Sequence, residues 1–332
     1  MFTITPEVKF AINAVRQSAK LVKTVQTETA QNALTKGDKS PVTVADFASQ
    51  ALVSHLLQKD FPNVVLVGEE ASDALKEEGA AHLLEQVTGY VARYVPESNP
   101  DSVCELIDWG AASPTKRFWT LDPIDGTKGF IRGDQYVVAL ALVEDGDVKI
   151  GVLGCPNLTD GYISEPEGAG TIILAVRGEG AWMAKMLLDT ESNNWQQIHA
   201  SPRAEPSQSR LMRSFESGHT DVSKIDEIAS ALGVDVDPVR MDSQAKYSVL
   251  AVGEGEVILR LLSPKMPNYQ EKIWDQAAGS IVLEEAGGRI SDLDGKPLDF
   301  SQGRKLIKNR GVLATNGHLH DAVLKVLKKV GA

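Results

Sequence analysis

The stretch FWTLDPIDGTKGF, residues 118–130, constrains the fold most, because it places Asp122 and Asp125 at the end of an otherwise apolar, strand-like run. Buried carboxylates repel each other and lose solvation, so they stay ionised only where a cation compensates them. Pro123 and Gly126 predict that the strand ends here and curls, which would direct both carboxylates and a carbonyl between them at one point. The pair therefore indicates either a metal site or a plain acidic turn whose side chains accept hydrogen bonds from nearby amides.

The first half of the chain mixes helical and strand-like segments. A helix is predicted from Pro6 to about Val22, and a loop over 35–46 precedes a second helix that ends at about Lys59. NVVLVGEE is typical of a short buried strand, and HLLEQVTGYVARYV of an amphipathic helix. YVVALALVEDGDVKIGVLG and GTIILAVRGEGAWMAKM each predict two antiparallel strands joined by a turn.

The second half alternates helices and strands more regularly. TDVSKIDEIASALGV, WDQAAGSIVLEEAGG and HLHDAVLKVLKKV are helical in pattern, whereas VILRLL and GVLAT read as strands. A chain of 332 residues exceeds what one hydrophobic core usually serves, so two domains are expected. The polar stretch from about Leu188 to Pro206 predicts the boundary, with an α+β domain over 1–190 and an α/β domain over 191–332.

Composition excludes several classes of function. The formal net charge of −11 argues against a general nucleic-acid or anionic-membrane surface, since both require a basic face. No apolar run approaches the length of a membrane span, and the N-terminal region lacks the apolar core of a signal peptide, so we expect a cytoplasmic protein. Cys104 and Cys155 form neither a CxxC motif nor a Cys/His cluster, so neither a disulfide framework nor a zinc site is indicated.

Acidic residues recur where predicted elements begin or end: Asp46, Glu69, Asp122, Asp125 and Asp275. Each has an ordinary alternative. Asp46 and Asp275 suit helix N-caps, and Glu69 suits a solvated charge after a strand. The joint pattern is different, because GEE, DPIDGT and WDQAAG occur together and in this order.

These motifs resemble those of the inositol monophosphatase superfamily, the magnesium-dependent and lithium-sensitive phosphatases. The resemblance runs nearly end to end and is closest to the 3'(2'),5'-bisphosphate nucleotidases, through KSPVTVAD, LDPIDGTKGFIRGDQY, DSQAKY and EKIWDQAAG. It implies an α+β fold with αβαβα layers. The mixed α+β half would carry most metal ligands, and the α/β half would carry Asp275 and the nucleotide-binding residues.

The resemblance also implies roles for individual residues. Glu69, Asp122, Asp125 and Asp275 match metal-ligand positions, together with the Ile124 carbonyl. Hard oxygen ligands of this kind select Mg²⁺, and two ions, or three once the 35–46 loop closes, are implied. Asp46 and Thr127 match the pair that activates the attacking water.

Positions that contact the nucleotide are implied as well. They are Gly126, Thr127, His219, Ser243, Lys246 and Arg260. Lys and Arg suit a second, non-reacting phosphate, whereas the ordinary alternatives are a surface lysine and an arginine whose stem covers apolar surface. His219 suits stacking on the nucleoside or a helix cap, and Val222 stands where relatives often carry another histidine.

The resulting hypothesis is hydrolysis of adenosine 3',5'-bisphosphate to AMP and phosphate, with 3'-phosphoadenosine 5'-phosphosulfate as a second substrate. An inositol polyphosphate 1-phosphatase is the nearest enzymatic alternative, because fold and metal site alone do not separate the two. A catalytically idle nucleotide or metal sensor is the alternative from another class. The substrate is in each case a small molecule, and the sequence leaves the oligomeric state open.

Overall fold

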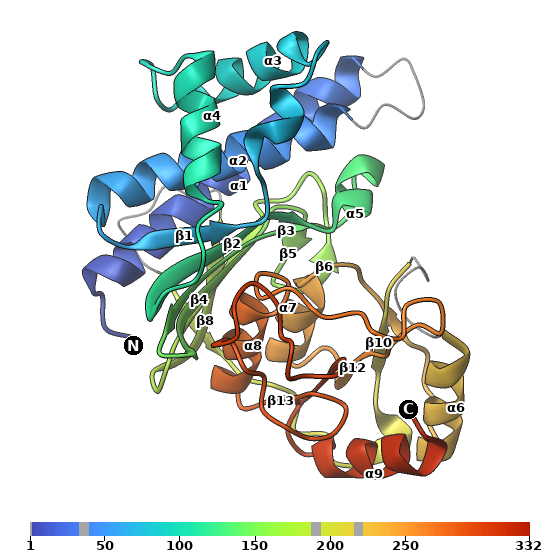
Figure 1. The fold of residues 1–332 in the computed structure, drawn as a ribbon. Coiled ribbons are helices and arrows are strands. Elements are labelled where there is room, and N and C mark those ends of the chain that lie inside the picture. The colour runs from blue at the N-terminus through green and yellow to red at the C-terminus, as the bar shows by residue number, and fades with distance from the viewer. Residues whose placement is uncertain (1, 33–39, 187–193, 216–221) are drawn as a thin grey trace.

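The computed structural model describes residues 2–32, 40–186, 194–215 and 222–332. Within them the chain forms five layers, in the order helices, sheet, helices, sheet and helices (Figure 1). Such stacking buries the apolar face of every helix and both faces of the larger sheet. The predicted αβαβα fold is confirmed.

A mixed sheet of seven strands forms the centre of the first half. Its order is β1-β2-β3-β4-β7-β8-β9, and only β1 and β2 in it pair in parallel. The bounds are β1 (Val65–Gly68), β2 (Arg117–Asp125), β3 (Val137–Glu144), β4 (Asp147–Cys155), β7 (Thr171–Val176), β8 (Gly180–Lys185) and β9 (Gln196–Ile198). A small hairpin of β5 (Leu158–Thr159) and β6 (Ile163–Ser164) lies beside it.

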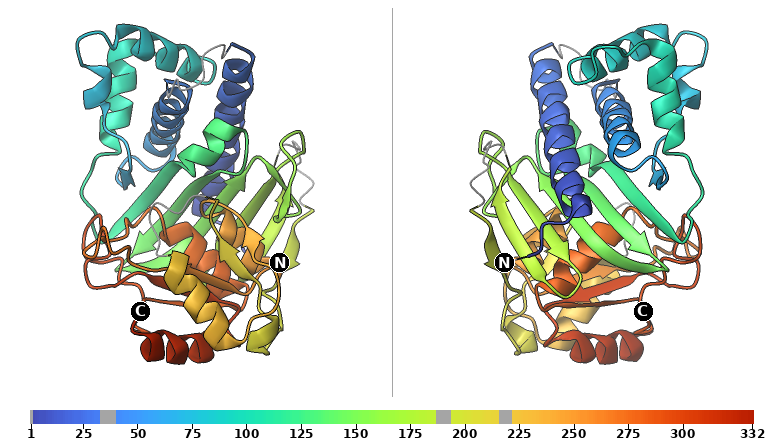
Figure 2. Two further views of the ribbon diagram at one scale, coloured as in Figure 1. Left: turned by 90° about the vertical axis from the view of Figure 1, so that its right-hand side faces the viewer. Right: turned by 90° about the vertical axis from the view of Figure 1, so that its left-hand side faces the viewer.

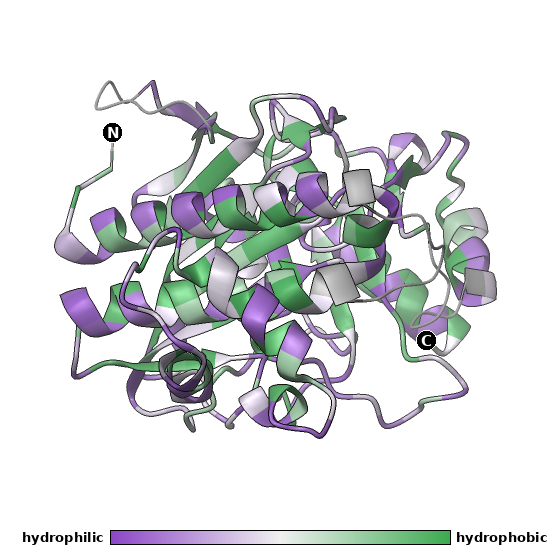
Figure 3. Cartoon of the chain, turned by 90° about the horizontal axis from the view of Figure 1, so that it is seen from above, coloured by the Kyte–Doolittle hydropathy of each residue, from purple (hydrophilic) through white to green (hydrophobic). Residues whose placement is uncertain are grey.

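Two long helices cover one face of this sheet, α1 (Pro6–Asn32) and α2 (Ser40–Asp60) (Figures 1 and 2). Outside α2 lie α3 (Ala81–Val91) and α4 (Pro100–Trp109), with the 3-10 turn η1 (Ser72–Leu75) beside α4. Seen from above, these helices carry both hydrophilic and hydrophobic residues (Figure 3). This pattern is expected of helices that bury one face.

The other face of the sheet is covered by α7 (Ala245–Ala251) and α8 (Ala277–Glu285), which come from the second half of the chain. Glycines permit this close approach. A Cβ on Gly151 of β4 would lie 2.3 Å from Ile281 Cγ2, and one on Gly279 would lie 2.2 Å from the Tyr247 ring. The packing of α8 therefore fixes the second half of the chain on the first sheet.

The second sheet is smaller and has the order β11-β10-β12-β14-β13. Its bounds are β10 (Leu211–Arg213), β11 (Val239–Arg240), β12 (Val257–Arg260), β13 (Arg289–Ser291) and β14 (Val312–Thr315). The outer helices α6 (Val222–Leu232) and α9 (His320–Val330) close the last layer, and the 3-10 turn η2 (Pro206–Gln208) precedes β10. None of the described helices combines the length and the hydrophobicity that a membrane span requires.

One local expectation was wrong. Residues 40–46 are helical, not part of a loop, because α2 begins at Ser40 with Pro41 in its first turn, where proline's fixed φ is compatible with a helix. The strand ends at the predicted turn, because Gly126, directly after Asp125, adopts a left-handed φ of 98°, but Pro123 itself lies inside the strand. β2 continues to Asp125 with a shift in its register against β3, which accommodates the proline. The domain boundary at residue 190 remains a prediction.

Candidate active site

Glu69 and Asp122 come together because β1 and β2 are parallel neighbours. Gly68 pairs with Leu121, so the next residue of each strand emerges at the same edge of the sheet. Thr120 strengthens this edge, since its hydroxyl donates to the Val67 carbonyl at 3.0 Å. The order of the strands therefore places one carboxylate beside the other.

The irregular end of β2 adds a further carboxylate. The register against β3 shifts between Asp122 and Asp125, and Ile124 inside this bulge is 2% exposed. Gly126 then adopts a left-handed conformation with φ of 98°, and a Cβ there would lie 2.8 Å from the Ser243 Cβ. Only glycine satisfies both requirements, so this turn brings Ser243 against the end of the strand.

Gln244 connects Asp125 to the region that carries Asp275. Its backbone N–H donates to Asp125 Oδ2 at 2.7 Å, and its side-chain amide donates to the Trp274 carbonyl at 3.0 Å. The same side chain accepts a hydrogen bond of 3.0 Å from the Gly279 N–H in α8. Buried polar groups need such partners, so this one residue fixes carboxylates from both halves of the chain relative to each other.

Asp46 and Thr127 lie on elements that pack against each other. Asp46 is inside α2, and Thr127 is the first residue of the short helix α5 (Thr127–Arg132), which contacts α2. Burial holds the pKa of Asp46 well above its ordinary value, and the negative charges of Glu70 and Glu69 raise it further. The Thr127 side chain is exposed.

The carboxylates influence one another strongly. Burial raises the pKa of Asp122 well above its ordinary value, and the charges of Glu69, Asp125, Asp275 and Asp46 raise it further. The Glu69 side chain reaches solvent, yet partial burial and then Glu70 and Asp125 raise its pKa to about 7, while a hydrogen bond with Asp122 opposes the shift. Burial also raises the pKa of Asp125, and raises that of Asp275 well above its ordinary value, although Arg260 lowers both. The predicted acidic residues therefore form one cluster around Asp122.

This cluster suits a divalent cation. Asp122 is 2% exposed, and its Oδ1 has no hydrogen-bond partner among the described residues. A buried oxygen without a donor is costly, and several carboxylates with raised pKa values need positive charge nearby. Across residues 2–32, 40–186, 194–215 and 222–332, no group of three or more His, Cys, Asp or Glu side chains is arranged to hold a metal ion as the side chains stand.

Lys246 and Arg260 lie beside these carboxylates. Burial lowers the pKa of Lys246 to about 8, the charge of Arg260 lowers it further, and Asp125 opposes the shift. The ammonium donates to the Ser214 hydroxyl at 2.9 Å. Ser243, with φ of 59°, sits in the turn before α7. His219, also predicted as a nucleotide contact, lies outside the described residues.

Several residues next to the site were not predicted from the sequence. The Gln50 side chain accepts from the Glu70 N–H at 3.0 Å and donates to the Glu70 carbonyl at 2.7 Å, which fixes the segment after β1. Arg304 donates to the Gly68 carbonyl, and its guanidinium lies 4.8 Å from the centre of the Trp274 ring. Glu271 is the first residue of the EKIWDQAAG motif, yet only the fold pairs it with Arg260.

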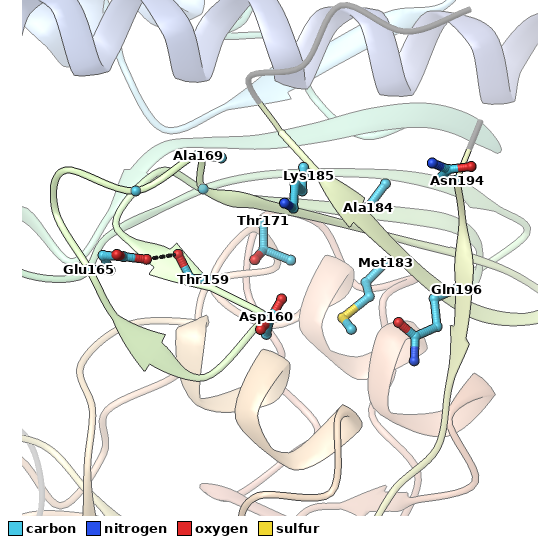
Figure 4. A pocket seen from close by; sticks show the side chains of 12 residues that line it. Thr159, Asp160, Glu165, Ala169, Thr171, Met183, Ala184, Lys185, Asn194 and Gln196 are labelled. Carbon is cyan, nitrogen blue, oxygen red and sulfur yellow. Dashed lines mark hydrogen bonds between the residues drawn. The ribbon is translucent and has the colours of Figure 1, made fainter. Parts of the chain in front are cut away.

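A separate cavity of about 430 Å³ lies along β7 and β8 near the β5–β6 hairpin (Figure 4). Asp160, Glu165 and Lys185 supply its charges, and the Thr159 hydroxyl donates to Glu165. It shares no lining residue with the acidic cluster, so it has no part in the arrangement described above.

Five alternating layers with an acidic cluster at the edge of the first sheet define a class of phosphatase fold. The chain belongs to the inositol monophosphatase family, whose model matches residues 4–332. Within the family it is similar to the 3'(2'),5'-bisphosphate nucleotidase of Schizosaccharomyces pombe, at 40% identity over 341 residues covering 98% of this chain and 95% of that protein. The 3'(2'),5'-bisphosphate nucleotidase of Oryza sativa is 40% identical over 341 residues, covering 97% of this chain and 93% of the relative.

A solved structure agrees on the fold. The inositol monophosphatase from Anabaena matches with a TM-score of 0.61 and covers 97% of this chain and 94% of its own, at 22% sequence identity. At that identity the likeness concerns the fold alone. The family membership predicted from the sequence motifs is confirmed.

Proposed function

We propose that this chain is a 3'(2'),5'-bisphosphate nucleotidase that hydrolyses the 3'-phosphate of adenosine 3',5'-bisphosphate to give AMP and phosphate. 3'-Phosphoadenosine 5'-phosphosulfate is a second substrate in this proposal. The observation that carries it is the convergence of Glu69, Asp125, Asp275 and Asp46 on the buried carboxylate of Asp122. The full-length similarity to nucleotidases supports the choice of substrate.

Members of the inositol monophosphatase family are metal-dependent, and we assign Mg²⁺ as the metal here, with two ions. Glu69, Asp122, Asp125 and Asp275 would hold them, together with the Ile124 carbonyl. Oxygen donors of this kind match the preference of Mg²⁺, and Asp122, at the centre of the cluster, is suited to contact both ions. When bound, the metal neutralises these carboxylates and polarises the phosphoryl group.

Asp46 and Thr127 supply the proton chemistry in this proposal. Burial makes Asp46 a stronger base than an exposed aspartate, because it raises the pKa of the carboxyl well above its ordinary value. Thr127 offers a hydroxyl from the helix that packs against α2. It would orient the attacking water and pass its proton toward Asp46, and the turn at Gly126 would hold Thr127 in place for this role.

Recognition of the nucleotide is assigned to the second half of the chain. Lys246 and Arg260 would bind the 5'-phosphate, which does not react, through charge-assisted hydrogen bonds. Ser243 is brought against Gly126 by the turn between β2 and α5, and in this proposal it also contacts the nucleotide. His219 is assigned to the nucleoside on its sequence match alone.

Phosphate release measured side by side on three substrates tests the proposal. With Mg²⁺, adenosine 3',5'-bisphosphate should be hydrolysed far faster than inositol 1,4-bisphosphate, and AMP should not react. Preference for the inositol substrate would instead identify an inositol polyphosphate 1-phosphatase. Absence of turnover on all three, with nucleotide binding retained, would identify an idle sensor.

A further inference from the structure

Glu271 is a buried carboxylate that the proposed reaction does not use. It is 6% exposed, and both of its oxygens contact the guanidinium of Arg260. Arg260 Nε donates to Oε1 at 3.0 Å, and Arg260 Nη2 lies 2.8 Å from Oε2. Such paired contacts fix the plane of a guanidinium as well as its position.

A second group holds Glu271 from the other side. Gln276 donates from Nε2 to Glu271 Oε2 at 2.8 Å, and its own oxygen accepts from the Tyr247 hydroxyl at 2.6 Å. Gln276 is fully buried and follows Asp275 directly. The position of the Glu271 carboxylate is therefore tied to α7 and to the start of α8.

The pairing leaves one end of Arg260 available. Glu271 occupies the side of the guanidinium formed by Nε and Nη2, and Nη1 has no hydrogen-bond partner among the described residues. The Arg260 side chain is 26% exposed, whereas that of Glu271 is 6% exposed. A planar fork held along one side still presents the N–H groups at its end, in the arrangement that suits two phosphate oxygens.

Charge also favours this arrangement. Arg260 and Lys246 are close enough for the arginine to lower the pKa of the lysine, while Glu271 raises it. Two cations that repel each other would otherwise separate when no phosphate is bound. Glu271 offsets this repulsion and keeps both charges beside the site.

We propose that Glu271 is a positioning residue that holds Arg260 ready to receive the non-reacting phosphate of the substrate, and so sets the preference for bisphosphates over monophosphates. The inference rests on the proposed function, because it concerns how the same site selects its substrate. It assigns Glu271 no contact with the substrate and no part in cleaving the phosphate ester.

The test uses Glu271→Gln, which preserves size but presents an amide N–H₂ where the guanidinium needs an acceptor. kcat and KM are measured on adenosine 3',5'-bisphosphate and on 3'-AMP, which lacks the 5'-phosphate. The variant should raise KM for the bisphosphate about tenfold, with kcat nearly unchanged, and should leave the kinetics of 3'-AMP within about twofold.

Glu256→Gln is the matched control. Glu256 is also fully buried, and it also pairs with an arginine, because Arg210 Nη2 lies 2.7 Å from its Oε1. It lies outside the proposed site, so this change should lower the melting temperature without altering the ratio of the specificity constants for the two substrates. The two variants together separate loss of a buried ion pair from loss of positioning.

The double variant Arg260→Ala with Glu271→Gln completes a double-mutant cycle for these two residues. If Glu271 acts through Arg260, the double variant should discriminate between the two substrates no worse than Arg260→Ala alone. Equal losses on both substrates in Glu271→Gln, or an additional loss of discrimination in the double variant, would overturn the inference. Failure of the proposed function gives a different result, namely an unmodified protein that does not prefer the bisphosphate, or an Arg260→Ala variant that loses no preference.

Discussion

The buried ammonium of Lys246 predicts that substrate preference depends on pH. Its pKa falls from 10.5 to about 8, chiefly because of burial and then because of Arg260, while the charges of Asp125, Asp242 and Glu271 oppose the fall. The side chain is 8% exposed, so solvent screens these effects little. In the protein without substrate, Lys246 is therefore charged at neutral pH and largely neutral two units higher.

The size of the effect follows from the contact that is lost. A charge-assisted hydrogen bond to phosphate contributes about 1.5 to 3 kcal/mol, which is roughly a ten- to hundredfold change in specificity constant. Above the pKa the charged fraction falls about tenfold for each pH unit. The preference for the bisphosphate should thus begin to fall near the pKa and reach its lower limit one to two units above it.

The assay measures kcat/KM for adenosine 3',5'-bisphosphate and for 3'-AMP from about pH 6.5 to about pH 10, because this constant reports ionisations of the free enzyme. Ionisation of the attacking water or of Asp46 affects both substrates and cancels in the ratio. The ratio should fall as the pH rises through about 8. In the control Lys246→Arg, the guanidinium stays charged and the ratio should remain flat. A flat ratio in the unmodified protein would refute the assignment of Lys246 to the 5'-phosphate.

Three further outcomes are expected. Asp122→Asn should lower turnover at saturating Mg²⁺ by at least about a hundredfold. It should also raise the melting temperature of the metal-free protein at pH 7, because the raised pKa of Asp122 means that the folded protein loses stability as this carboxyl ionises with increasing pH. Activity within a few-fold of the parent would contradict the role of Asp122 as a metal ligand. Asp46→Asn and Thr127→Ala should keep Mg²⁺ binding by calorimetry and lose about a hundredfold in kcat, whereas weakened binding with an intact rate would exclude their assignment to water activation. LiCl should inhibit turnover more strongly at high than at low bisphosphate concentration, with KCl as the control. Inhibition is expected because Li⁺ matches Mg²⁺ in size but carries half its charge. Relief of the inhibition by excess substrate would count against this arrangement.

The sequence predicts those parts of the fold that depend on local pattern. The hairpins β3–β4 and β7–β8 follow from paired apolar runs joined by glycine-containing turns, and both formed as expected. Gly68 and Leu121 align only in the folded sheet, yet the acidic residues after them were identified by their motifs. The motifs thus locate the acidic cluster without indicating how it is assembled.

The remaining features depend on contacts between distant segments. The bulge at Pro123 requires β3 as a partner, so the residues alone predicted the end of the strand but not the shift in register before it. Gln244 lies in a predicted motif, but its contacts with Asp125 and with the Trp274 carbonyl join segments far apart in sequence. The ion pair of Glu271 with Arg260 is of the same kind. Such pairs leave no periodic signal in one sequence.

The position of the bond that is cleaved distinguishes a 3'-nucleotidase from a phosphatase of another specificity. Phosphorus NMR of adenosine 3',5'-bisphosphate during turnover distinguishes loss of the 3'-phosphate from loss of the 5'-phosphate. With Mg²⁺ present, we expect 5'-AMP and inorganic phosphate in equal amounts, and no reaction when EDTA removes the metal. Formation of 3'-AMP, or hydrolysis that continues in EDTA, would contradict the proposed function.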